Sequence, residues 1–351
     1  MTPSKISRIM QKCDLCPRNC QVDRYVNKGA CGVGAEMYAA RAALHFWEEP
    51  VISGSRGSGA VFFTGCNLGC VYCQNAAISQ LNDVLPGKPV SVEKLADIFL
   101  RLQDEQGANN INLVTAVHYV PQVALTLGIA KDKGLKIPVV YNTSSYEKVE
   151  SLKMLDGLVD VYLPDFKYIT PELAGKLSKA PDYPQVAIAA IDEMVRQVGE
   201  AEFVKEEPFG RQNASCIEEN PAKTKLTVSD KIDDKKGAVY EPGGPLIQKG
   251  VIVRQLLLPG HVRESKKALE FLHERYGDRI YISIMNQYTP MRTDFSKEDH
   301  DLSPLGRKVT RREYSQLVDF AINRGIENGF TQTGDTAESS FIPQWNGEGI
   351  D

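Results

Sequence analysis

The chain has 351 residues, of which 42% are hydrophobic and 25% are charged. These are ordinary globular values, and they exclude a wholly disordered or collagen-like chain. Lysine and arginine total 41 against 45 aspartate and glutamate residues, a formal net charge of -4, which argues against a protein that holds nucleic acid by neutralising phosphates over a broad surface. No stretch has the apolar pattern of a signal peptide or a membrane span. We therefore expect a soluble cytoplasmic protein with one large domain, additions to it, and no nucleic acid or membrane partner.

Residues 1–45 show little periodic apolar pattern and much cysteine, proline and glycine, so we expect them to need a metal or a neighbouring domain to become ordered. From residue 59 onward, strand and helix patterns alternate. Strands are expected at 60–64, 111–115, 137–142, 159–164, 251–258 and 280–285. Helices are expected at 90–106 with Ser91 as N-cap, at 121–133, at 146–155, within 170–198 and at 264–275.

This alternation predicts an α/β fold of six strand and helix units with parallel strands, either a doubly wound sheet or a full or partial barrel. In all of these the chemistry lies at the carboxyl ends of the strands. Residues 201–249 interrupt the alternation with a long polar stretch. We expect a mobile loop or lid that contributes to substrate selection, and the alternative is a surface insertion without a role.

Cysteine is the most informative residue, because seven of the eight cysteines lie within the first 73 residues. A disulfide framework is typical of small secreted chains, so reduced thiols around metal fit this longer chain better. The exception is Cys216, which lies in the polar stretch and is interpreted as an incidental thiol.

The strongest signal is the loop Cys-Asn-Leu-Gly-Cys-Val-Tyr-Cys, which directly follows the first expected strand. Its thiolates, Cys66, Cys70 and Cys73, can face one side of the loop and bind three irons of a four-iron cluster. No fourth cysteine follows at ligand spacing, so one iron would stay open to bind a substrate or cofactor. The alternative is a structural zinc site completed by a distant histidine such as His45 or His118.

This loop, with Tyr72 just before its last cysteine, resembles the hallmark of the radical SAM superfamily. The resemblance implies a partial (β/α)6 TIM-like barrel in which S-adenosylmethionine chelates the open iron of a [4Fe-4S] cluster. It also implies that one electron cleaves the cofactor to methionine and a 5′-deoxyadenosyl radical, which abstracts hydrogen from a substrate. An electron donor such as flavodoxin or ferredoxin is implied as a partner.

Other stretches resemble a branch of that superfamily, the proteins similar to the activating enzyme of pyruvate formate-lyase. They are the Cys-x-x-Cys-Pro-Arg-x-Cys pattern at 13–20, Glu49-Pro50 with Ser53-Gly54, and the run from Arg254 to Gly260. Members of this branch are mostly named by homology. The substrate is therefore left open between a glycyl radical enzyme, a peptide and a small molecule.

The resemblance also implies a cofactor site at the strand ends. Asp165 and Lys167 match an Asp-x-Lys of the activating enzymes that lies beside S-adenosylmethionine, and an exposed ion pair is the alternative. Asn142 and Ser144 follow the preceding strand, where Asn142 replaces an acid of those relatives and so weakens the case for a cation there. Arg254 could pair with the cofactor carboxylate.

One departure from the family follows the second strand. The superfamily usually has Gly-Gly-Glu there, whereas this chain has Thr115 and His118. We expect these two residues to take over the contact to the methionine amino group. For His118, a purely structural role is an equally good interpretation.

Four further thiols, Cys13, Cys16, Cys20 and Cys31, form a complete set for a second [4Fe-4S] cluster or a tetrahedral zinc. A closed site of this kind suits electron relay or structure, and we favour a cluster. The expected organisation is a cysteine-rich segment at 1–45, a radical SAM core at 46–330 interrupted at 201–249, and a tail at 331–351. The predicted function is a radical SAM enzyme, and the alternatives are a non-catalytic iron-sulfur electron carrier and a zinc-stabilised binding module.

Overall fold

The structure is a computed structural model that describes residues 1–351 except 82–83, 207–243, 292–294, 296–298 and 333–342. Its strands are β1 Tyr38–His45, β2 Ser58–Phe63, β3 Lys88–Pro89, β4 Ile111–Val114, β5 Val139–Thr143, β6 Val161–Pro164, β7 Glu202–Lys205, β8 Pro245–Leu256, β9 Tyr281–Met285 and β10 Gly329–Thr331. Its α-helices are α1 Pro3–Gln11, α2 Pro50–Ser53, α3 Ala76–Ser79, α4 Val92–Asp104, α5 Val120–Asp132, α6 Val149–Leu152, α7 Pro171–Ser178, α8 Tyr183–Val198, α9 Val262–Tyr276 and α10 Arg311–Asn323. Four short 3-10 helices are η1 Val117–Tyr119, η2 Lys153–Leu155, η3 Gly277–Arg279 and η4 Ser303–Gly306.

The strands form one open, largely parallel sheet. Strands β2, β4, β5, β6, β8 and β9 are parallel neighbours in that order, and β10 adds a further parallel strand outside β9. Antiparallel pairings add β1 to β2, β3 to β1, and β7 to β8. Within the described part of the chain no pairing joins β3 to β10, so the sheet does not close. This confirms the predicted α/β fold with six strand and helix units in a partial barrel.

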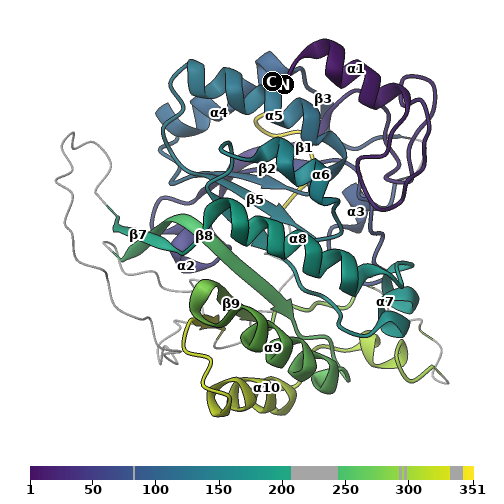
Figure 1. Cartoon of the computed structure of the whole chain (residues 1–351), viewed down its shortest axis with the longest axis vertical. Helices are drawn as coiled ribbons and strands as arrows, with labels where there is room; N and C mark the ends of the chain where they lie inside the picture. The colour runs from purple at the N-terminus through teal and green to yellow at the C-terminus, as the bar shows by residue number, and fades with distance from the viewer. Residues whose placement is uncertain (82–83, 207–243, 292–294, 296–298, 333–342) are drawn as a thin grey trace.

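Helices cover the outer face of the sheet, with α4, α5, α8 and α9 on the side seen in Figure 1. In α4 the apolar side chains of Leu95, Ile98, Phe99 and Leu102 are buried. The predicted N-cap is confirmed because the Ser91 hydroxyl accepts a bond from the Lys94 amide at 3.2 Å. Such a cap satisfies a donor that the first helical turn leaves unpaired. Because the helices connect successive parallel strands as crossovers, the carboxyl ends of these strands lie at one edge of the sheet.

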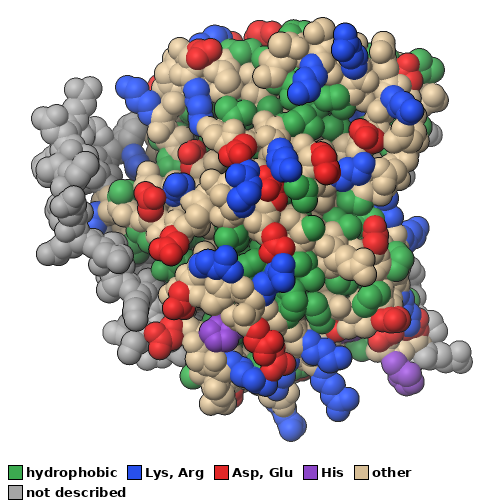
Figure 2. Space-filling model, viewed as in Figure 1, with side chains coloured by type: hydrophobic (Ala, Val, Ile, Leu, Met, Phe, Trp, Pro, Cys, Tyr) green, Lys and Arg blue, Asp and Glu red, His purple; other side chains and the backbone are tan. Residues whose placement is uncertain are grey.

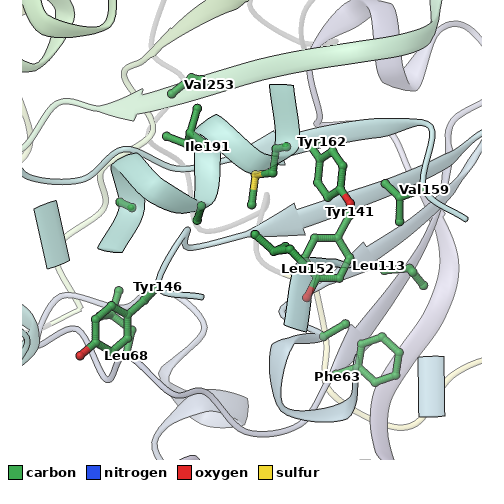
Figure 3. Close-up of a cluster of buried hydrophobic side chains, with 14 of the residues drawn as sticks. Phe63, Leu68, Leu113, Tyr141, Tyr146, Leu152, Val159, Tyr162, Ile191 and Val253 are labelled. Atoms are coloured by element: carbon green, nitrogen blue, oxygen red, sulfur yellow. The ribbon is translucent and has the colours of Figure 1, made fainter. Parts of the chain in front are cut away.

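The strands are buried on both faces, which is why they are expected as continuous apolar runs. Large aromatic side chains fill the layer between sheet and helices, and Tyr141 and Tyr162 meet edge to face at 5.9 Å (Figure 3). Their hydroxyls are paired, since Tyr141 donates to Glu147 and Tyr162 donates to Gln197. Pairing of this kind removes the cost of burying a polar group.

The segment 1–45 has more structure than expected. Helix α1 and strand β1 both fall inside it, and Ile6, Met10, Cys13 and Leu15 form a small core of their own. The sequence pattern does not predict β1 because this strand is dominated by alanine, which has a low strand preference, and the strand forms by pairing with β2.

The polar stretch is shorter than expected. Strand β8 begins at Pro245 rather than at 251, and it pairs with β7 as an antiparallel hairpin stem. Glu206 is buried just after β7 and accepts bonds from the Ser55 and Asn109 nitrogens. Residues 207–243, with Cys216 and the predicted lid, lie outside the described residues.

The C-terminal residues 343–351 run beside β1. The Ala42 amide donates to the Glu348 carbonyl at 2.8 Å and the Gly347 amide donates to the Ala40 carbonyl at 3.0 Å. Trp345 packs on Phe62 of β2, with ring centroids 5.1 Å apart. The tail therefore covers part of the open side of the barrel.

Two surface features complete the description. None of the helices in the described ranges is long and apolar enough to span a bilayer. On the face shown in Figure 2, lysines and arginines are interspersed with aspartates and glutamates over the helices.

Candidate functional site

The cysteine loop follows β2 directly, so the end of a buried strand positions its thiols. Each of the three thiols receives a hydrogen bond. The Leu68 amide donates to the Cys66 sulfur at 3.4 Å, the Ser178 hydroxyl to the Cys70 sulfur at 3.1 Å, and the Ser79 hydroxyl to the Cys73 sulfur at 3.2 Å. Donors aimed at sulfur stabilise thiolates and tune an iron-sulfur cluster.

The donor to Cys70 belongs to a buried chain of hydroxyls. Tyr168 is hydrogen-bonded to both Tyr72 and Ser178, at 2.7 Å in each case. Tyr72 is buried beside the rings of Tyr168 and Tyr288, and burial followed by the charge of Tyr168 raises its pKa well above the ordinary value. The chain of hydroxyls therefore stays protonated and holds Ser178 toward the sulfur.

The three thiols face a cavity of about 230 Å³ at the carboxyl ends of the strands. The cavity brings together most of the residues predicted for the cofactor. Those lining it are Cys66, Cys70, Cys73, Tyr72, Thr115, Asn142, Ser144, Asp165, Lys167 and Arg254. Lining residues that the sequence analysis did not assign to the site include Trp47, Glu48, Gln74, Asn75 and Gln287.

A buried ionic network forms the floor of the cavity. The Asp165 carboxylate accepts from Arg254 Nε at 2.9 Å and from Lys167 Nζ at 2.6 Å. Burial alone would raise the pKa of Asp165, but Arg254 and Lys167 outweigh it and hold that pKa below its ordinary value. Asp165 is therefore ionised, and it fixes both cations beside the cysteine loop. The side chains of Asp165, Lys167 and Arg254 are only 11–20% exposed, so the network is largely buried, in contrast to the exposed ion pair considered as its alternative.

Glu48 is the main residue that the sequence analysis missed. It accepts from Arg254 at 3.1 Å, from Asn142 at 3.1 Å and from Asn112 at 3.0 Å. The pKa of Glu48 is raised by burial, with Arg254 opposing the shift. The sequence did contain a signal for Glu48. This residue directly precedes Glu49-Pro50, which is one of the stretches that resemble the family, in the loop that follows β1.

Thr115 ends β4 in an unusual backbone conformation, with φ at 61°. This left-handed region costs a β-branched residue free energy and is normally occupied by glycine. Thr115 also lines the cavity. The threonine thus adopts a conformation that glycine normally occupies, at the position where Thr115 is expected to replace a Gly-Gly pair.

His118 requires a correction, because it does not line the cavity. Its Nε2 lies 2.8 Å from the Thr64 carbonyl oxygen, and its own carbonyl accepts from the buried Arg24. Burial, and then the charge of Arg24, lowers the pKa of His118 to about 3. It is a neutral histidine behind the cysteine loop, so we withdraw it from the cofactor site.

The four N-terminal thiols lie together. The charges of Cys13 and Cys20 affect the pKa of Cys31, and the charges of Cys31 and Cys13 affect the pKa of Cys16. A Cβ added to Gly29 would lie 3.3 Å from the Cys31 sulfur and 3.5 Å from the Cys20 sulfur. The two metal motifs of the sequence therefore form two separate thiol groups.

In neither thiol group are the sulfurs arranged around the position of a single metal ion. Among the residues that the structure describes, no three histidine, cysteine, aspartate or glutamate side chains are arranged to hold a single metal ion.

Comparison with known proteins relates part of the chain to one family. Residues 60–200 match the family model of the radical SAM superfamily. This match begins in β2, includes the loop of Cys66, Cys70 and Cys73, and ends after α8.

The individual proteins that match this chain do so over part of their length or at low sequence identity. The chain is 35% identical over 179 residues to the Uncharacterized protein MJ0674 of Methanocaldococcus jannaschii, a match that covers 50% of this chain and 51% of the relative. The matched part thus spans about half the length of that curated relative. SuiB of Streptococcus suis, bound to S-adenosylmethionine, is similar over 77% of this chain and 48% of its own, at 13% identity and a TM-score of 0.43. The maturase HydG of Carboxydothermus hydrogenoformans is similar over 97% and 73%, at 12% identity and a TM-score of 0.40.

Proposed function

We propose that this chain is an enzyme that reductively cleaves S-adenosylmethionine at the loop of Cys66, Cys70 and Cys73. The observation that carries the proposal is that these thiols, each with a hydrogen-bond donor, face a charged cavity at the carboxyl ends of parallel strands. When bound, a four-iron cluster supplies the electron that splits the cofactor into methionine and a 5′-deoxyadenosyl radical, which takes a hydrogen atom from the substrate.

The floor of the cavity would bind the cofactor's polar groups. Lys167 lies close enough to Cys70 for each charge to favour the other, which suits a contact to a carboxylate beside the cluster. Asp165 offers acceptor oxygens to hydroxyls or an amino group. Arg254 already donates to Asp165, Glu48 and Asn142, so its main role is to position them, and its remaining N–H groups can reach the carboxylate.

The strand ends would contribute contacts of another kind. Thr115, in the left-handed conformation, can turn a backbone carbonyl toward the methionine amino group. Ser144 can donate to the cofactor from the loop after β5, and the Tyr72 ring closes the cavity beside the cysteines. These groups orient the cofactor and exclude water from the reacting atoms.

We further propose that Cys13, Cys16, Cys20 and Cys31 hold a second four-iron cluster rather than zinc. The support is that the four thiols lie near one another and that four soft thiolates are a complete ligand set for such a cluster. The proposed division of the chain remains a metal-binding segment at 1–45, a core at 46–330 and a tail at 331–351. The segment and the core share hydrogen bonds, as described below.

The residues that line the cavity also bear on the class of substrate. We propose a protein or peptide whose backbone enters the cavity, a glycyl radical enzyme being one such partner, with a small molecule as the alternative. The amides of Gln74, Asn75 and Gln287 and the ring of Trp47 at the lining suit an amide-rich substrate. A flavodoxin or ferredoxin would supply electrons.

The decisive experiment is anaerobic reconstitution, reduction and assay for 5′-deoxyadenosine after addition of S-adenosylmethionine. The triple variant with alanine at residues 66, 70 and 73 should make none above background, and Cys216→Ala, which changes the cysteine outside both motifs, should match the unmodified chain. If the triple variant still makes the product, the site is misassigned. If the unmodified chain makes none, the electron-carrier alternative is favoured.

Metal content tests the second site. Reconstituted protein should contain about eight irons per chain, as two four-iron clusters require. Four irons with one zinc would disprove the second cluster and leave the first proposal intact.

A further inference from the structure

The two thiol groups, although separate in sequence, touch each other through the backbone. The Cys66 amide donates to the Cys31 carbonyl at 3.2 Å, so a ligand of one proposed cluster is hydrogen-bonded to a ligand of the other. Gly65, with φ at 99°, permits this contact, because a Cβ at that position would lie 2.9 Å from the Cys31 carbonyl oxygen. A larger residue would separate the two loops.

A second link joins Cys16 to the same loop. The side chain of Asn67, next to Cys66, lies beside the Cys16 thiol and lowers the pKa of that thiol against the effect of burial. Asn67 is itself buried and donates to the Tyr146 carbonyl at 2.6 Å, which fixes its orientation. Two cysteines of the N-terminal group therefore contact the 66–73 loop directly.

Arg18 clamps the two loops together. From within the N-terminal motif it donates to the carbonyls of Asn67 and Leu68 at 2.8 Å each, and to those of Ser178 and Lys179 at 3.0 and 2.5 Å. Ser178 is the residue that donates to the Cys70 sulfur. The guanidinium thus joins the N-terminal motif both to the 66–73 loop and to the end of α7.

The position of the N-terminal thiols indicates the direction in which an electron would cross this contact. None of its cysteines lines the cavity, where the bound cofactor and substrate would cover the open iron. Its outer rim is at the surface, since Asn19, Gln21 and residues 25–28 are exposed. An electron can thus reach the first cluster from outside while the cavity is occupied.

We propose that the N-terminal site is the electron entry of the enzyme, an inference that rests on the proposed function. Cys13, Cys16, Cys20 and Cys31 would hold a cluster that accepts one electron from a protein donor. The hydrogen bond from the Cys66 amide to the Cys31 carbonyl would then connect this site to the site of Cys66, Cys70 and Cys73, so that the electron could move from the first site to the second. The electron is consumed when the sulfonium bond is cleaved, so a chain holding two electrons can cleave two cofactors in succession.

The test measures how much 5′-deoxyadenosine forms from the electrons that are stored on the protein. Protein is reduced by Ti(III) citrate, freed of reductant by anaerobic gel filtration, and mixed with S-adenosylmethionine. We expect about two 5′-deoxyadenosines per chain, one for each four-iron cluster, at a yield that does not change on dilution. The double variant Cys13→Ser with Cys31→Ser should give about one, a two-fold loss, from its single cluster.

Spectroscopy provides a readout that does not depend on activity. The fully reduced chain should show an electron paramagnetic resonance spectrum split by interaction between two clusters, and the double variant should show one unsplit signal. A single product per unmodified chain, or two clusters without magnetic interaction, would overturn the relay. These measurements on the unmodified chain decide the question even if the double variant loses both clusters. An interacting pair without any product would instead refute the proposed function.

Discussion

Removal of the Ser178 hydroxyl should lower the reduction potential of the cluster at Cys66, Cys70 and Cys73. Ser178 is fully buried and donates to the Cys70 sulfur at 3.1 Å, so no water replaces it when it is changed to alanine. A hydrogen bond to a charged acceptor contributes about 1.5–3 kcal/mol. Reduction adds one negative charge spread over the cluster, so we assign about a third of that energy, roughly 0.5–1 kcal/mol, to the difference between the two oxidation states.

Converted at about 59 mV per tenfold for one electron, this energy corresponds to a potential roughly 20–45 mV lower in Ser178→Ala. The assay is a potentiometric titration followed by electron paramagnetic resonance. Ser79→Ala should shift the potential less, because Ser79 is only half-buried and water can take its place beside Cys73.

The matched control is Ser58→Ala. Ser58 is equally buried and donates to Asn110 at 2.6 Å, but it lies at the opposite end of β2 from the cysteine loop. The reasoning would be refuted if Ser178→Ala and Ser58→Ala had the same reduction potential while the cluster was fully occupied in both variants. It would mean that the hydroxyl does not interact with the ligated sulfur.

Three further changes have defined outcomes. Lys167→Ala should weaken S-adenosylmethionine binding in calorimetry roughly tenfold or more, as loss of one charged hydrogen bond implies, while the cluster's absorbance persists; unchanged affinity would remove Lys167 from the site. Thr115→Gly should raise the free energy of unfolding in denaturant titrations by up to about 1 kcal/mol, because relief of left-handed strain exceeds the added chain entropy, whereas Thr115→Ala should gain less. Burial raises the pKa of Glu147 to about 7 against the opposing bonds from Thr143 and Tyr141. Its stabilising contribution is therefore complete below its unfolded pKa of about 4.3 and is lost as the pH rises through about 7, so Glu147→Gln should flatten the stability profile over that window.

The sequence was sufficient for the framework of the fold because its strands are buried on both faces and read as apolar runs. The same pattern could not reveal β1 or the start of β8 at Pro245, since both are stabilised by backbone pairing to a neighbouring strand. Strand β10 and helix α10 follow the last expected unit and were also missed. Periodicity reports what each segment buries, whereas edge pairings depend on where the neighbours lie.

For the candidate site, spacing and resemblance predicted the residues that follow strands, since parallel strands end at one edge. They could not distinguish Thr115 from His118, because only the backbone shows that Thr115 turns into the cavity while His118 turns toward Arg24. They also could not show that Arg18 joins the two cysteine motifs. Its four acceptors are backbone carbonyls, which leave no trace in the side-chain pattern.

The network around Asn142 explains why an asparagine suits this position better than an acid. The Asn142 amide donates to Glu48 at 3.1 Å, and its carbonyl oxygen accepts from Arg254 at 2.6 Å. An aspartate could accept from Arg254 but could not donate to Glu48, and two carboxylates would then face each other in a buried site. With asparagine, the positive charges of Arg254 and Lys167 can be balanced by Asp165 and Glu48. Glu48 thus supplies, from the β1 side, a second carboxylate to the floor of the cavity.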